Sequence, residues 1–189
     1  MINMEALRIE RLCTYADYYA WEGDERYELI DGVAYAMSPA PTMGHQSVTG
    51  NIYHHIRLFL RDKPCKVFIS PFDVRLNGDG DDDTDVVQPD VVVVCDKTKL
   101  DYKGCNGAPD LAVEVLSPSS VKKDTVMKFH AYQRAGVREF WIVDPGMKTV
   151  MVHILDAGRY VTSTYTDDDI VPVHVLDGCM ISLPDIFAE

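Results

Sequence analysis

The chain has 189 residues, 47% of them hydrophobic, which is enough for a single domain with a substantial core. No apolar run approaches the roughly 18 to 20 residues that cross a bilayer, and the N-terminus lacks a basic segment followed by an apolar one, so we expect neither a membrane protein nor an exported one. The formal net charge of −12 speaks against tight, unassisted binding of nucleic acid, because such binding relies on a basic face. It still allows a local basic patch, or metal ions that cancel the acidity of a site.

The cysteines are odd in number and scattered, with no close pair; they are Cys13, Cys65, Cys95, Cys105 and Cys179. This pattern fits neither a disulfide framework nor a zinc site. A reducing cytoplasm is the simplest setting for such a chain, so we expect a cytoplasmic protein.

The first third of the chain contains clear signals for local structure. Thr14-Tyr-Ala-Asp17 matches a capping box and predicts a short helix that ends near Gly23. Asp31-Gly32, between apolar runs at 27–30 and 33–37, predicts a tight hairpin turn. An amphipathic helix is expected over 44–62, with one broad apolar face made by Val48, Ile52, Ile56, Phe59 and Leu60.

The middle of the chain favours strands and one acidic loop. Two strands are expected at 66–70 and 72–76, interrupted by Pro71. The segment 78–85 has five aspartates and resembles the start of a calcium loop, but it lacks the glycine required at the sixth position. We therefore expect a solvated loop whose charges repel one another, with a weak cation site as the alternative.

The second half of the chain alternates strands and a helix. Apolar runs at 88–95 and 110–117 read as buried strands, and a helix begins at Ser117-Pro-Ser-Ser and runs to about 135, where Gly136 suits its end. Further strands are expected at 139–143, 149–155, 160–164 and 171–175. The sequence thus predicts one α/β (α+β) domain over 1–189, with a mixed β-sheet flanked by helices. The strands on either side of the helix would be neighbours joined by a right-handed crossover, and hairpins at both ends would extend the sheet.

Two carboxylates stand out on the buried strands. Glu114 interrupts an apolar run, and an ionised acid there needs a cation, hydrogen bonds or a raised pKa. Asp90 stands at the entrance of the preceding strand. Such a pair with a nearby lysine can hold a divalent metal and activate water. Each residue alone also has a structural explanation, since Glu114 could be paired with Lys128 or Arg138 without any catalysis.

Several motifs in a fixed order give a more specific indication. They are Tyr27-Glu-Leu-Ile-Asp-Gly32, Gln88-Pro-Asp-Val-Val, Leu111-Ala-Val-Glu-Val-Leu-Ser-Pro-Ser-Ser, Asp124…Lys128…Tyr132 and Gly136-Val-Arg-Glu-Phe-Trp-Ile-Val-Asp-Pro. Over about 27–155 the chain resembles the Uma-two family, bacterial proteins described as restriction endonucleases and formerly a domain of unknown function. That family is assigned to the PD-(D/E)XK nuclease superfamily, which implies a restriction endonuclease-like mixed sheet flanked by helices.

The resemblance implies a magnesium site. Asp90 and Glu114 match the two metal-binding acids of the superfamily, but the position of its usual lysine, two residues after the Glu, is Leu116 here. In the family the lysine comes from the following helix, where Lys128 matches; Lys122 and Lys123 are the fallback donors. Helical spacing places residues 124, 128 and 132 on one face.

Further residues complete the expected site. The backbone carbonyl of Val115 would be a third ligand of the magnesium ion, and Lys128 would act as the base that positions the attacking water. Glu28 matches an acidic position of the family, where it would bind the metal or hydrogen-bond the lysine. His45 could touch substrate or a ligand acid, or have only a structural role at the end of its helix.

The leading hypothesis is therefore a magnesium-dependent endonuclease that hydrolyses DNA phosphodiester bonds. The net charge and the displaced lysine favour an alternative, a catalytically inactive nuclease-like scaffold or binding module. A third possibility is a metal hydrolase acting on a smaller phosphoester. Since duplex cleavage needs two active sites or two successive nicks, a homodimer is also plausible, although no residue-level pattern indicates its surface.

Overall fold

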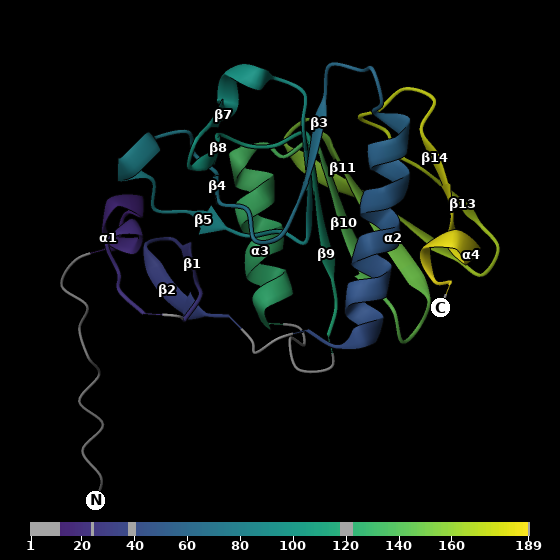
Figure 1. The fold of residues 1–189 in the computed structure, drawn as a ribbon, viewed down its shortest axis with the longest axis horizontal. Coiled ribbons are helices and arrows are strands. Elements are labelled where there is room, and N and C mark those ends of the chain that lie inside the picture. The colour runs from purple at the N-terminus through teal and green to yellow at the C-terminus, as the bar shows by residue number, and fades with distance from the viewer. Residues whose placement is uncertain (1–11, 24, 38–40, 118–122, 189) are drawn as a thin grey trace, which may run out of the picture.

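The computed structural model describes residues 12–23, 25–37, 41–117 and 123–188, and the side chains of helix α3 from residue 126 onward. Within these residues the strands form two six-stranded sheets and one two-stranded sheet (Figure 1). The expected α/β fold with a mixed sheet flanked by helices is confirmed. The serine caps proposed at 118–120 lie outside the described residues.

The central sheet has the strand order β12-β11-β10-β9-β6-β3. Its strands are β3 (Lys66–Ile69), β6 (Val91–Val94), β9 (Leu111–Val115), β10 (Glu139–Asp144), β11 (Thr149–Asp156) and β12 (Arg159–Thr166). Strands β9 and β10 are parallel neighbours connected through α3 (Lys123–Ala135), as the sequence predicts, and the other pairs are antiparallel. Gly136, with φ of 86°, follows the helix in the left-handed conformation that glycine tolerates best.

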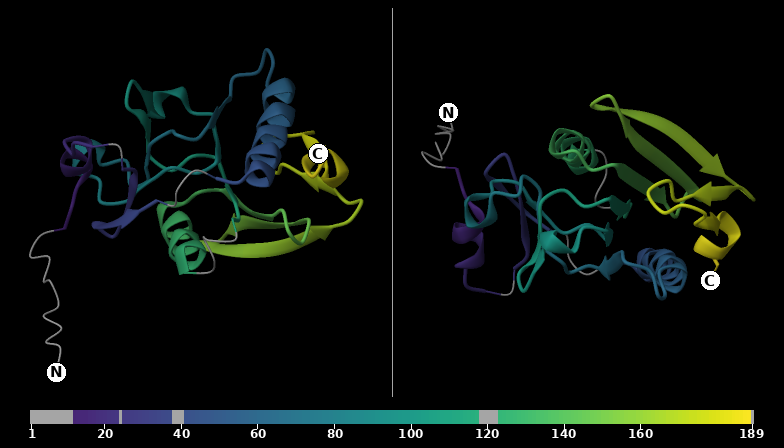
Figure 2. Two further views of the ribbon diagram at one scale, coloured as in Figure 1. Left: turned by 60° about the horizontal axis from the view of Figure 1, so that its bottom comes forward. Right: turned by 90° about the horizontal axis from the view of Figure 1, so that it is seen from above.

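Other elements lie on both sides of the central sheet (Figures 1 and 2), and an apolar cluster fills each of the two interfaces. On one face it packs against α2 (Met43–Phe59) and a C-terminal unit of β13 (Ile170–Pro172), β14 (Met180–Ser182) and α4 (Leu183–Ile186). On the other face it packs against α3 and against part of the second sheet. Trp141 and Phe140 are fully buried on opposite faces of β10, in agreement with the apolar pattern of that strand. Strand β14 and helix α4 had no sequence signal that we used.

The second sheet has the order β2-β1-β5-β4-β8-β7. Its strands are β1 (Tyr27–Ile30), β2 (Val33–Ala36), β4 (Val74–Arg75), β5 (Val86–Val87), β7 (Leu100–Asp101) and β8 (Gly104–Asn106), and α1 (Tyr15–Tyr19) lies next to β1 and β2 in Figure 1. The capping box at Thr14 is confirmed. The hairpin turn is also confirmed, and its two central residues, Asp31 and Gly32, have positive φ. The prediction that this hairpin extends the central sheet is wrong, because β1 pairs with β5 instead.

The acidic loop is ordered by its own acids, so the prediction of a self-repelling solvated loop is wrong. A short 3-10 helix, η1 (Gly80–Asp82), occupies its centre, and a second one, η2 (Lys97–Lys99), precedes β7. Asp83 is fully buried, and its carboxylate accepts the backbone N–H groups of Asn77, Gly78 and Asp85. Backbone donors of this kind stabilise the charged form of a buried carboxylate.

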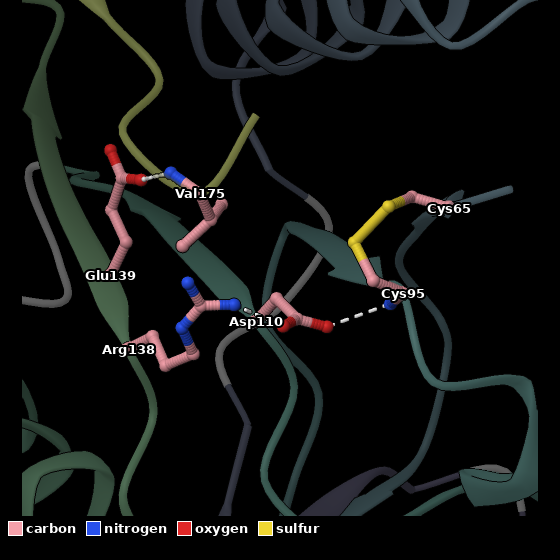
Figure 3. The surroundings of a disulfide bond; sticks show 6 residues. All are labelled: Cys65, Cys95, Asp110, Arg138, Glu139 and Val175. Carbon is pink, nitrogen blue, oxygen red and sulfur yellow. Dashed lines mark hydrogen bonds and ion pairs between the residues drawn. A yellow bond between two sulfur atoms is a disulfide. The ribbon is translucent and has the colours of Figure 1, made fainter. Parts of the chain in front are cut away.

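A disulfide joins the two strands at the edge of the central sheet (Figure 3). Cys65 and Cys95 lie one position beyond the pair Lys66 and Val94 in the register of β3 and β6, and their sulfurs are 2.05 Å apart. The sequence-based view that the cysteines form no disulfide is wrong, because the register of two strands, and not spacing along the chain, brings them together. The Asp110 carboxylate accepts a hydrogen bond from the backbone N–H of Cys95 at 2.7 Å and forms an ion pair with Arg138 at 3.0 Å. Figure 3 shows both contacts beside the disulfide. The cytoplasmic location stays a prediction.

Candidate active site

Glu114 is directed towards α3 by the alternation of β9. Leu111, Val113 and Val115 pack on the face covered by α2, while Ala112 packs on the face covered by α3. Glu114, two residues after Ala112, meets two side chains of α3. Lys128 donates to its Oε1 at 3.0 Å and the hydroxyl of Tyr132 donates to the same oxygen at 2.6 Å.

Lys128 lies between two carboxylates. Its Nζ is 2.8 Å from Oε1 of Glu28 on β1 and 3.0 Å from Oε1 of Glu114 on β9. The backbone N–H of Gln88 also donates to Oε1 of Glu28, at 2.8 Å. Only 10% of the Lys128 side chain is exposed, so this ion pair is largely shielded from water. Glu28 therefore contacts the lysine, which was one of the two roles expected for it. Of the two cations considered as partners of Glu114, Lys128 pairs with it, whereas Arg138 pairs with Asp110.

The electrostatics of this group favour a protonated lysine. The pKa of Glu114 is raised to about 7, and burial is the largest cause. The charge of Lys128 lowers the pKa, whereas the charges of Glu28 and Asp90 raise it. Burial by itself would lower the pKa of Lys128, but the carboxylates of Glu114 and Glu28 outweigh it and raise that pKa above its usual value. An ammonium in this position donates hydrogen bonds to the carboxylates, and the base role expected for Lys128 stays a prediction.

Asp90 is brought next to the Glu114 strand by sheet pairing. Strands β6 and β9 are antiparallel with Val91 opposite Val113, and the Oδ2 of Asp90 accepts the backbone N–H of Val115 at 2.8 Å. The same oxygen lies 3.2 Å from Nε2 of His45, near the start of α2. The two expected metal-binding acids therefore lie at the same end of neighbouring strands.

His45 is fixed by the first turn of its helix. The backbone N–H of His45 donates to the Thr42 cap at 3.3 Å, and its Nδ1 is 3.5 Å from the hydroxyl of Thr49. Burial by itself would lower the pKa of His45, but the hydrogen bond and charge of Asp90, with the carbonyl of Val115, outweigh it and raise the pKa. Of the contacts expected for His45, the structure shows the one with Asp90, an acid expected to bind metal.

These groups line one cavity of about 330 Å³. Its wall includes Asp90 and Glu114 on the sheet, Lys128, and Leu116, which stands two residues after Glu114. Arg26, Ser70 and Gln88 contribute polar groups to the same wall; Arg26 donates to Ser70 at 3.0 Å and also to Gln88. The cavity is large enough for a nucleotide-sized group with ordered water.

Comparison with known proteins assigns the chain to a family. Residues 15–184 match the model of the Uma2 family, described as "Putative restriction endonuclease". The chain belongs to the Uma2 family. A crystal structure of a putative nuclease belonging to DUF820 from Anabaena variabilis has the same fold, with a TM-score of 0.74 at 20% identity over 93% of this chain and 97% of that chain. No curated protein matches the chain.

Carboxylate oxygens are the ligands that magnesium prefers, and two of them in this Uma2 protein are not used by the described part of the chain. No group of three or more His, Cys, Asp or Glu side chains in the described part of the chain is arranged to hold a metal ion. One oxygen of each acid, Oδ1 of Asp90 and Oε2 of Glu114, makes no hydrogen bond to a described residue, whereas the other oxygen is used by the protein. Magnesium takes oxygen ligands and retains several waters, so two carboxylates and one carbonyl suffice for it.

Two contributors to the Uma2 site were not assigned a role from sequence. The hydroxyl of Tyr132 shares Glu114 with Lys128, and the backbone of Gln88 holds Glu28. The spacing of four residues from Lys128 to Tyr132 was the available signal for the tyrosine, whereas no pattern identifies a backbone donor. The side chains of Lys122, Lys123 and Asp124 lie outside the described residues. No described helix is long and apolar enough to cross a membrane.

Proposed function

We propose that this Uma2 protein is a magnesium-dependent endonuclease that hydrolyses phosphodiester bonds of DNA in the cavity between β6, β9 and α3. The observation that carries the proposal is the position of Lys128, which reaches Glu114 from α3 and lines the same cavity as Asp90, while Leu116 occupies the usual lysine position. The family description, "Putative restriction endonuclease", supports a nucleic acid substrate, and the solved structure with the same fold is likewise titled a "putative nuclease".

Asp90, Glu114 and the carbonyl of Val115 would hold the magnesium ion. When bound, the ion would lower the pKa of a water and neutralise charge on the phosphate. The hydrogen bonds to Asp90 and Glu114 from described residues use only one oxygen of each carboxylate. The other oxygen stays available to a cation, which supports this assignment.

The remaining side chains would position the reacting groups. Lys128 would donate a hydrogen bond to the attacking water or to a phosphate oxygen, since its raised pKa keeps it protonated. Glu28 and Tyr132 would fix the lysine and Glu114 in place through their hydrogen bonds. His45 would orient Asp90. The cavity wall carries the carboxylates of Glu28, Asp90 and Glu114 beside the cations Arg26 and Lys128, so the bound magnesium ion would have to supply the positive charge that a phosphate substrate needs.

The test is nicking of supercoiled plasmid by the purified protein with and without magnesium. We expect Glu114→Gln and Asp90→Asn each to lower the rate by about a hundredfold or more, because each removes a charged ligand. Asp156→Asn, on the exposed end of β11, is a matched control that should keep the wild-type rate. Magnesium-dependent cleavage at the wild-type rate in both site variants, with folding verified by circular dichroism, would rule the proposal out.

A binding module without catalysis is the second candidate, and the net charge with the apolar Leu116 favours it. Calorimetric titration separates the two. The nuclease proposal predicts magnesium binding that Glu114→Gln abolishes, and the scaffold predicts none in a folded protein. Cleavage of a small phosphodiester such as bis(p-nitrophenyl) phosphate, without cleavage of DNA, would indicate the smaller-phosphoester hydrolase.

A further inference from the structure

The strand β12 forms one edge of the central sheet and is exposed over most of its length. It is eight residues long and pairs with β11 along one side (Figure 2). All of its side chains are exposed except Tyr160 and Tyr165, which are half-buried, and Val161 exposes 59% of its surface. An edge of this length is available for pairing with another strand.

β12 lacks the features by which soluble proteins protect sheet edges. Edge strands are commonly short, or carry a proline, a lysine or a bulge. Residues 160–166 contain no charged residue and no proline, and the register with β11 runs without a bulge from Thr149 and Thr166 to Asp156 and Arg159. The opposite edge, β3, has four residues, begins with Lys66 and is followed by Pro71. The two edges of the sheet are therefore protected to very different degrees.

The hydrogen bonds at the two ends of β12 identify the backbone groups that face outward. The N–H of Tyr160 donates to the side chain of Gln133 at 3.0 Å, and the N–H of Thr166 donates to the side chain of Asp169 at 2.8 Å. Both groups point away from β11. Because strand backbones alternate with a period of two, Thr162 and Thr164 also point their N–H and C=O groups outward. In the described part of the chain these groups have no partner.

We propose that β12 pairs in antiparallel fashion with β12 of a second copy of this chain, around a two-fold axis at Ser163. In this register Thr162 exchanges both backbone hydrogen bonds with Thr164 of the second copy, and Thr164 does the same with its Thr162. A shift by two residues in either direction would leave one threonine of each copy unpaired, so this register satisfies the most groups. The interface is isologous, as a closed dimer requires.

Side chains across the proposed interface are complementary. Asp167 follows the last residue of β12 in a turn, so in this register Arg159 at the start of one strand comes near Asp167 just beyond the end of the other, and unlike charges lie near both ends of the interface. Val161 is placed opposite Tyr165, an aromatic and β-branched pair that stabilises neighbouring strands. The two central sheets would join into one continuous sheet. This inference stands apart from the proposed nuclease function, although a dimer would supply two active sites.

The first experiment measures the mass of the full chain by sedimentation equilibrium between about 1 and 200 μM. We expect a reversible monomer–dimer equilibrium. In Thr164→Pro, a proline removes an outward donor without breaking a bond to β11, so it should weaken dimerisation at least tenfold while the circular dichroism spectrum stays unchanged. A wild-type chain that is monomeric throughout this range would overturn the proposal.

The second experiment tests the register with engineered cysteines. Ser163→Cys should form a dimer disulfide rapidly under mild oxidation, because the axis places the two residues opposite each other in a close, non-hydrogen-bonded pair. Val161→Cys is the matched control, also exposed but distant from its own copy in this register. Equal cross-linking of both variants would contradict the proposal. Arg159→Glu should weaken the dimer, and adding Asp167→Lys should restore its stability. An unchanged dimerisation constant in both variants would also contradict the proposal.

Discussion

Removal of the buried cation Lys128 should destabilise the fold in a manner that depends on pH. In Lys128→Met the length of the side chain is kept but the charge between Glu28 and Glu114 is lost. The side chains of these two glutamates are 10% and 15% exposed, so water can compensate little of the missing attraction. Breaking a buried ion pair by removing one partner typically costs about 3–5 kcal/mol. We expect a value near the lower end, because the Tyr132 hydroxyl and the Gln88 N–H remain as donors.

The sign of the pH dependence follows from the raised pKa of Glu114. Burial already raises that pKa from 4.5 to about 7, and loss of the ammonium should raise it further. A folded-state acid with a raised pKa binds a proton that the unfolded chain releases, so stability falls as pH rises from 4.5 through the folded-state pKa. The penalty of Lys128→Met should thus be about 3 kcal/mol at pH 8 and under about 1.5 kcal/mol at pH 5.

Urea denaturation of both proteins at the two pH values measures these differences. Lys97→Met, an exposed lysine of η2, is the control and should change stability by less than about 0.5 kcal/mol. A penalty below about 1 kcal/mol at pH 8 would refute the reasoning, and so would an equal penalty at both pH values, since either result would mean that the two glutamates are not a buried, charged pair.

Three further predictions concern the rest of the molecule. Burial lowers the pKa of His153 from 6.5 to about 4, so between these two pH values the unfolded chain binds a proton that the folded chain does not. The stability should therefore fall by up to about 3 kcal/mol as the pH drops from 6.5 to 4, and denaturation curves of His153→Gln should show a smaller fall. Asp83→Ala should lower the unfolding free energy by about 2–4 kcal/mol, because four backbone donors lose their acceptor; a melting temperature within 1 or 2 °C of wild type would argue against this role. Joint replacement of Cys65 and Cys95 by serine should cost about 3 kcal/mol, given their separation of 30 residues, and a reductant should have a similar effect on wild type but none on the variant.

Local features of the fold were predictable where a short stretch of sequence decides the outcome. The capping box at Thr14, the turn at Asp31-Gly32 and the end of α3 at Gly136 depend on a few neighbouring residues, and all three formed as expected. The parallel pair of β9 and β10 followed from the order strand, helix, strand. Glu114 could be identified because a carboxylate in an apolar strand needs a cation, hydrogen bonds or a raised pKa wherever the strand lies. Asp90 could be identified with it because it stands at the entrance of the preceding strand.

The sequence by itself therefore indicated most of the longer helices and strands of this protein, the candidate acids Asp90 and Glu114, and the lysine that matches them, but not short elements such as β7, β8, β14 and α4. Tertiary structure alone decided which groups meet: that Lys128 bridges Glu114 and Glu28, that Cys65 faces Cys95, and that Asp83 is held by backbone donors instead of solvent. The physical reason is that these contacts join segments far apart in the chain. They depend on strand register and on helix packing against the sheet, which only the burial of the whole core settles.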